Sequence, residues 1–170
     1  MKNTTKLITR PHASPKTIKS LYYGFANFIM YLAPWKISGF NSCAAATTGC
    51  IKSCLYKAGR GRFNNVQQAR INRTRFFYKE RGAFLDKLHH EIKLNINWAI
   101  KRDLKPVFRL NGTSDIRWEL YGIFEQYPDI TFYDYTKIIN RKNLPANYHL
   151  TFSRAENNQK NVLKAIDRGL

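Results

Sequence analysis

Apolar residues recur at helical spacing along two neighbouring segments in the middle of the chain. Residues 83–102 predict an amphipathic helix, because apolar side chains stand three or four positions apart. This stripe comprises Leu85, Leu88, Ile92, Ile96 and Ala99. Gly82 separates this helix from a preceding one, predicted over residues 64–78, which is strongly basic.

After residue 106 the pattern changes to short apolar runs that alternate with helical segments. The runs 107–110, 130–133 and 148–152 predict strands. Helical spacing follows the first and third runs, and a short helical piece is expected after the second. The predicted core positions of the two helices are Ile116, Leu120, Ile123 and Phe124, then Val162, Leu163 and Ile166. Such alternation predicts a parallel sheet with right-handed crossovers.

The N-terminal part is less regular. Residues 1–20 are basic and polar and predict a flexible arm. The apolar run 21–32 predicts a buried helix, and residues 35–40 a short strand that leads into the next loop. The inner side of this helix is expected to carry Phe25, Phe28, Ile29 and Leu32.

These elements together indicate one α/β domain over residues 21–170. About four strand–helix units are present, whereas a full (β/α)₈ barrel needs about 250 residues. The predicted fold is therefore a partial (half) (β/α) barrel with parallel strands and an N-terminal helical segment. Such a piece either closes in another way or is the N-terminal part of a longer barrel.

Polar residues follow each predicted strand. They are candidate ligand-binding residues, because functional groups gather at the carboxyl ends of parallel strands. The set comprises Asn111, Asp115, Asp134, Lys137 and Ser153. The bland alternative is that strand ends are polar because they meet solvent and cap helices.

All three cysteines fall within twelve residues, at Cys43, Cys50 and Cys54, so they can converge on one metal centre. Three thiolates suit an iron–sulfur cluster with one open iron. Structural zinc needs a fourth ligand, and every histidine lies at least thirty residues away from the cysteines. The remaining alternative is three ordinary buried thiols, and a disulfide framework is disfavoured by the odd count.

The formal net charge of +18 predicts affinity for polyanions, although a solvated basic surface is the commoner outcome. Between residues 57 and 81 basic side chains alternate with aromatic ones, so a nucleic acid is a candidate partner. The phosphate-binding candidates are Arg60, Arg62, Arg70, Arg73 and Arg75. This nucleic-acid-binding alternative assigns the cysteines to a structural metal.

Other classes find little support. The longest apolar run, about twelve residues, is too short to span a bilayer. A signal peptide needs a cleaner apolar core, so a cytoplasmic location is expected. The sequence contains no G-x-S-x-G, H-E-x-x-H or P-loop motif of the common hydrolases.

The run S-C-A-A-A-T-T-G-C-I-K-S-C-L-Y-K-A-G-R-G resembles the cysteine loop of the phage "gene product 88" family, a radical-SAM-like group. The segments R-L-N-G-T-S-D and F-Y-D-Y-T-K are similar to that family's strand ends, and the resemblance covers roughly residues 32–170. It implies a (β/α) barrel in the host cytoplasm. It further implies a [4Fe–4S] cluster on Cys43, Cys50 and Cys54 and S-adenosylmethionine, a small-molecule cosubstrate, at the open iron.

The cysteine spacing C-x6-C-x3-C differs from the C-x3-C-x2-C spacing of established radical SAM enzymes. Cleavage of S-adenosylmethionine requires the cluster and the methionine moiety to meet in a fixed geometry. The resemblance as a whole implies a radical-SAM-like enzyme, and the sequence does not name its substrate.

Overall fold

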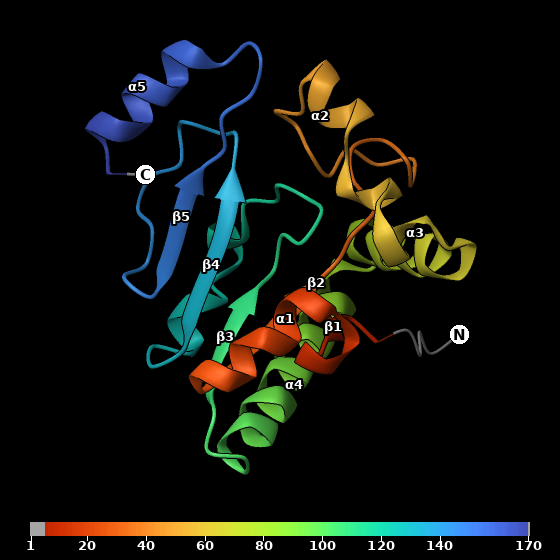
Figure 1. Ribbon diagram of the computed structural model, residues 1–170, viewed down its shortest axis with the longest axis vertical. Helices are drawn as coiled ribbons and strands as arrows, with labels where there is room; N and C mark the ends of the chain where they lie inside the picture. The colour runs from red at the N-terminus through yellow and green to blue at the C-terminus, as the bar shows by residue number, and fades with distance from the viewer. Residues whose placement is uncertain (1–5, 170) are drawn as a thin grey trace.

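The computed structural model describes residues 6–169, which form a mixed α/β fold around a five-stranded sheet (Figure 1). The strands lie side by side in chain order. They are β1 (Ile8–Thr9), β2 (Phe25–Met30), β3 (Lys105–Arg109), β4 (Thr131–Thr136) and β5 (Tyr148–Phe152). β1 runs antiparallel to β2, and β2 to β5 run parallel to one another.

The helices differ greatly in length. The two long ones, α3 (Asn64–Lys79) and α4 (Arg81–Ile100), lie between β2 and β3 in the chain and confirm the predicted helical pair. The others are α1 (Pro15–Ile18), α2 (Thr48–Lys52) and α5 (Gln159–Asp167). Short 3₁₀ turns occupy residues 11–13, 19–23, 55–57, 59–62, 118–121 and 124–126. None of the helices in residues 6–169 is long and apolar enough to cross a membrane.

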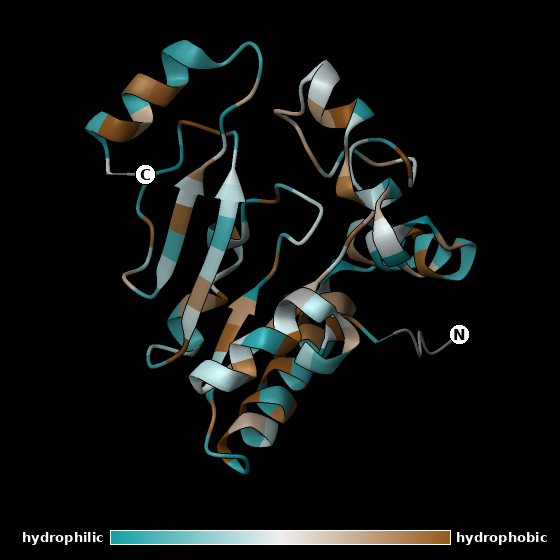
Figure 2. Cartoon of the chain, viewed as in Figure 1, coloured by the Kyte–Doolittle hydropathy of each residue, from teal (hydrophilic) through white to brown (hydrophobic). Residues whose placement is uncertain are grey.

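The core lies between α4 and one face of the sheet. Phe28, Phe108 and Phe132 occupy one row across β2, β3 and β4. Neighbouring rings in this row stack at 5.0 and 5.5 Å between centroids. The stripe of α4 packs on the same core through the fully buried side chains of Leu88 and Ile92. Apolar colour accordingly concentrates where the helix meets the strands (Figure 2).

The run at 21–32 was predicted to be helical but forms a 3₁₀ turn followed by β2. Gly24, with φ of 77°, ends the turn. β2 lies between two neighbouring strands, and most of its residues are buried. The sequence of a strand in that position is a continuous apolar run, and its periodicity does not distinguish it from a buried helix. Phe25 is 42% exposed rather than inward-facing.

Three further predictions near the strands were wrong. Residues 35–40 form turns instead of a strand, with the amides of Ile37 and Gly39 bonded to carbonyls three residues earlier. Residues 116–126 contain 3₁₀ turns instead of an α-helix. The last helix forms as predicted, but its expected core residues Leu163 and Ile166 are 58% and 66% exposed.

The predicted N-terminal arm is ordered from residue 6 onward. Ile8 and Thr9 pair with β2, and Leu7 is fully buried. The carboxylate of Glu91 on α4 accepts hydrogen bonds from the amides of Leu7 and Ile8. Residues 6–20 therefore belong to the domain, whereas residues 1–5 lie outside the described part of the chain.

The four parallel strands stand in the sequential order of barrel strands, yet the described sheet has two open edges. No α-helix separates β3 from β4 or β4 from β5. The repeating (β/α) unit is thus incomplete, and the supported description is a mixed α/β fold with a mostly parallel sheet.

A substitution at Gly112, just after β3, can test how closely the strand ends pack. A Cβ at this position would lie 2.6 Å from the Tyr31 ring and 2.7 Å from the Met30 carbonyl oxygen. We expect Gly112→Ala to lower the free energy of unfolding by about 1–3 kcal/mol, because backbone must shift. Urea denaturation measures the change.

Gly82→Ala is the matched control, because a Cβ there has no neighbour within 4 Å. Gly82 lies in α4, where alanine is favoured, so this variant should be equally stable or up to about 1 kcal/mol more stable. Equal stability of the two variants would contradict the close packing at Gly112.

Candidate functional site

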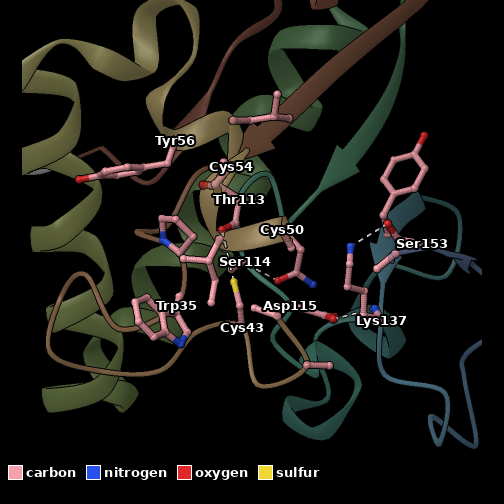
Figure 3. A pocket seen from close by; sticks show the side chains of 18 of the residues that line it. Trp35, Cys43, Cys50, Cys54, Tyr56, Thr113, Ser114, Asp115, Lys137 and Ser153 are labelled. Carbon is pink, nitrogen blue, oxygen red and sulfur yellow. Dashed lines mark hydrogen bonds between the residues drawn. The ribbon is translucent and has the colours of Figure 1, made fainter. Parts of the chain in front are cut away.

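A cavity of about 450 Å³ opens at the carboxyl ends of the parallel strands (Figure 3). The cysteine loop, residues 41–61, forms one side of it. Residues that follow β3, β4 and β5 form the other side. All three cysteines line this cavity, together with four of the five predicted strand-end residues: Asn111, Asp115, Lys137 and Ser153.

The start of the cysteine loop is fastened to the strand ends by hydrogen bonds around Ser42. The Ser42 hydroxyl donates to the Ala33 carbonyl, and the Ser42 carbonyl accepts from the Asp115 amide at 2.8 Å. The Cys43 thiol donates to the Thr113 carbonyl at 3.7 Å. This network sets Cys43 against the loop after β3.

The far part of the loop is held by Glu156, which follows β5. Its carboxylate accepts from the Gly49 amide at 2.7 Å and from the Thr47 hydroxyl at 2.8 Å. Thr47 caps α2 by accepting from the Cys50 amide. These hydrogen bonds lower the pKa of Glu156. A Cβ at Gly49 would lie 2.9 Å from this carboxylate, so a side chain there would displace Glu156.

The three thiols are free and partly buried. Burial raises the pKa of Cys43, which the backbone amide of Trp35 and the hydroxyl of Ser42 counteract. Within residues 6–169, no three Cys, His, Asp or Glu side chains are gathered closely enough to hold a metal ion. The thiols thus share one cavity wall without forming a closed ligand set in this conformation.

Opposite the cysteines, Asp115 and Lys137 carry charge into the cavity. Asp115 accepts from the Thr136 hydroxyl and the Lys137 amide, and burial raises its pKa. The Lys137 ammonium donates to the Ser153 hydroxyl at 2.9 Å. Loops after three different strands are therefore joined around one space, as the strand-end argument predicts.

Asp134 does not line the cavity, so the structure does not bring it together with the other four strand-end candidates. It lies within β4, is 1% exposed, and points to the same face as Phe132. Its carboxylate accepts from the Asn111 amide and side chain and from the Tyr148 hydroxyl. Arg109 lies 3.9 Å away.

Arg141 extends this buried network and was missed by sequence reasoning. Its guanidinium bonds the Glu119 carboxylate and the Tyr148 hydroxyl and lies 3.6 Å from Asp115. Glu119 lies in the 3₁₀ turn 118–121 and Arg141 in a loop, and neither segment is long enough for periodicity to mark a buried residue. Their pairing depends on contacts made by residues far apart in the chain.

The five arginines of the predicted phosphate-binding face are mostly engaged elsewhere. Arg73 donates to the carbonyls of Lys6 and Tyr31, and Arg75 donates to that of Ser38. Arg70 is buried between the rings of Tyr31 and Tyr56, at 4.8 and 5.6 Å from their centroids.

Arg60 is exposed and donates to the Ala13 carbonyl, and Arg62 is exposed. The nearby Phe76 and Phe77 are buried in the core. α3 therefore offers neither a continuous row of unengaged cations nor an exposed aromatic stripe.

Burial raises the pKa of Asp134 to about 7, against the lowering effects of the Asn111 amide and Arg109. Because the folded pKa lies above the unfolded value, the contribution of Asp134 to stability is highest below about pH 4 and falls as pH rises toward 7. We expect Asp134→Asn to remove this decline, which amounts to at most roughly 1.4 kcal/mol per pH unit.

Urea midpoints measured between about pH 4 and pH 7.5 test this. Asp86→Asn, at an exposed position of α4, is the control and should retain the wild-type slope. A wild-type advantage over Asp134→Asn that grows with pH would instead indicate an ionised carboxylate stabilised by Arg109.

The comparison with protein families covers almost the whole chain. The family model described as Gene product 88 matches residues 1–169. No curated protein and no solved structure gives a significant match. The match includes β1 and β2 as well as the cysteine loop and the strand ends, so the chain belongs to the phage gene product 88 family.

Proposed function

We propose that this protein is an iron–sulfur, radical-SAM-like enzyme whose cluster is held by Cys43, Cys50 and Cys54. One observation supports it above the others: all three cysteines of the chain line a single cavity at the carboxyl ends of a parallel sheet. In such sheets this edge is the usual place for a ligand site.

The donor set fits a [4Fe–4S] cluster in type and number. Three thiolates serve three irons and leave the fourth iron to a small ligand. The cavity wall contains no histidine to complete a structural zinc site. The thiols must approach one another to hold a cluster, and α2, which carries Cys50, has no buried residue to resist a shift.

The opposite wall suits a zwitterionic cosubstrate. Lys137 and Arg109 present positive charge to the cavity, and Asp115 presents a carboxylate. An amino acid moiety needs both signs within one site, and S-adenosylmethionine contains such a moiety. A bound cluster supplies the one-electron chemistry, whereas these side chains orient the cosubstrate and hold its charges away from bulk water.

Metal and acid-labile sulfide content of anaerobically purified protein tests the proposal. We expect about four iron and four sulfide per chain. Replacing Cys43, Cys50 or Cys54 singly by serine should reduce iron to less than about one per chain, because two thiolates do not retain the cluster.

Thr48→Ala is the matched control, since Thr48 lies on α2 between the cysteines, is exposed and does not line the cavity. This variant should keep the wild-type iron content. Zinc near one per chain without sulfide would overturn the cluster in favour of a structural metal. Iron content that none of the three serine variants changes would also overturn the proposal, because the cysteines would then not hold the iron.

A further inference from the structure

The sheet has two chemically different faces. Side chains that alternate with the buried core row point away from α4 and form what is here called the open sheet face. Besides Phe25, Ile29, Lys105 and Val107 on β2 and β3, it comprises Asn27, Arg109, Thr131, Tyr133, Tyr135, His149 and Thr151. Tyr135 is 47% exposed, and Thr131, His149 and Thr151 are exposed as well.

Parallel strands are normally covered on both faces. In Figure 1 the turns of residues 118–126 lie behind β4, and no helix lies in front of β4 or β5. Phe124 accordingly packs against Phe132 and Tyr148 on the core side. The part of the open sheet face on β4 and β5 is therefore left to solvent or to a partner.

The open sheet face is aromatic and cationic, and none of its members is acidic. The Arg109 guanidinium stacks over the Tyr135 ring at 4.8 Å, and the Tyr133 ring lies 6.5 Å from that of Tyr135. Asn27 donates to the Tyr133 hydroxyl, which orients that ring. The Asn27 Oδ1 atom is buried without a hydrogen-bond partner, and the buried Arg109 Nε atom has no hydrogen bond but lies 3.9 Å from the Asp134 carboxylate.

This face continues into the cavity, because Arg109 and Tyr135 also line it. Lys57, Lys137 and Arg154 add cations to the same rim. A second copy of the chain is a poor cover for this surface, since two like-charged faces on a protein of net charge +18 repel each other. An anionic partner with flat, stackable groups complements it.

We propose that the open sheet face binds single-stranded nucleic acid. Bases stack on Tyr135 and Tyr133, and the phosphate backbone pairs with Arg109 and the rim cations Lys137 and Arg154. Stacking on aromatic side chains within a positively charged groove is how sequence-tolerant single-strand binding works. The proposal assigns this role to the sheet rather than to α3, and it does not depend on the cluster.

Fluorescence anisotropy with a labelled oligothymidylate of about 15 nucleotides, in the site-size range of single-strand binders, tests the proposal. We expect Tyr135→Ala to weaken binding about ten-fold or more, the loss of one stacked base. Tyr22→Ala is the matched control. It also removes one exposed tyrosine, at 85% exposure, but lies outside the open sheet face, so affinity should not change.

Salt dependence reports the phosphate contacts separately. Arg154→Gln, at an exposed position, should reduce the slope of log K against log salt by about 0.7, the value for one contact with a single strand. Absence of binding, tighter binding to a duplex of the same length, or equal losses in Tyr135→Ala and Tyr22→Ala would overturn the proposal. A dimer in sedimentation that Tyr135→Ala dissociates would do so too, by showing that a second copy covers the face.

Discussion

The side chain of Asn111 holds together the edge of the sheet on which the candidate site is built. Its carbonyl oxygen accepts from the Ser114 hydroxyl, the Ile116 amide and the Trp118 indole. Its NH₂ group donates to the Ile116 carbonyl and to Asp134. One buried side-chain amide thus forms hydrogen bonds with several polar groups of the loop after β3 and connects that loop to β4. Buried polar groups are costly unless paired, so this loop has little freedom to adopt another path.

The rest of the cavity depends on that loop. The Ser42 carbonyl accepts from the Asp115 amide, and the Cys43 thiol donates to the Thr113 carbonyl, so the cysteine loop rests on the loop that Asn111 shapes. Arg141 adds a second support, because it donates hydrogen bonds to Glu119 and Tyr148 and forms an ion pair with Asp115. Removing one partner from such a buried charged network typically costs about 3–5 kcal/mol of stability. The α2 part of the cysteine loop, by contrast, is held mainly by hydrogen bonds to the exposed Glu156. The loop after β3 is therefore held more firmly than the α2 part of the cysteine loop.

One face of the sheet carries the core, and the other carries the proposed binding surface. The row of phenylalanines and the stripe of α4 supply the buried apolar area that stabilises the fold. The open sheet face keeps aromatic rings and a guanidinium in reach of a partner and leads directly to the cavity. A nucleic acid held there would bring its backbone or bases to the cysteine loop, so the two proposals are spatially compatible although each stands on its own observation.

The sequence alone determined those features that follow from local periodicity and from chain connectivity. The 3.6-residue spacing located α3 and α4, and short apolar runs located β3, β4 and β5. Because residues after parallel strands meet at one edge, Asn111, Asp115, Lys137 and Ser153 were correctly grouped, and the close spacing of the cysteines put them on one cavity.

The tertiary structure decided those features that depend on which other segments pack against a residue. Residues 25–30 became a strand because β1 and β3 pair with them, and a short apolar run carries no periodicity that distinguishes the two states. The expected strand at 130–133 extends to Thr136, so the pleat turns Asp134 into the core and Tyr135 outward. On α3, Arg73 and Arg75 donate to backbone carbonyls of segments far away in the chain, and Arg70 packs against the rings of Tyr31 and Tyr56. Local sequence carries no record of such contacts, since they exist only once distant segments have packed.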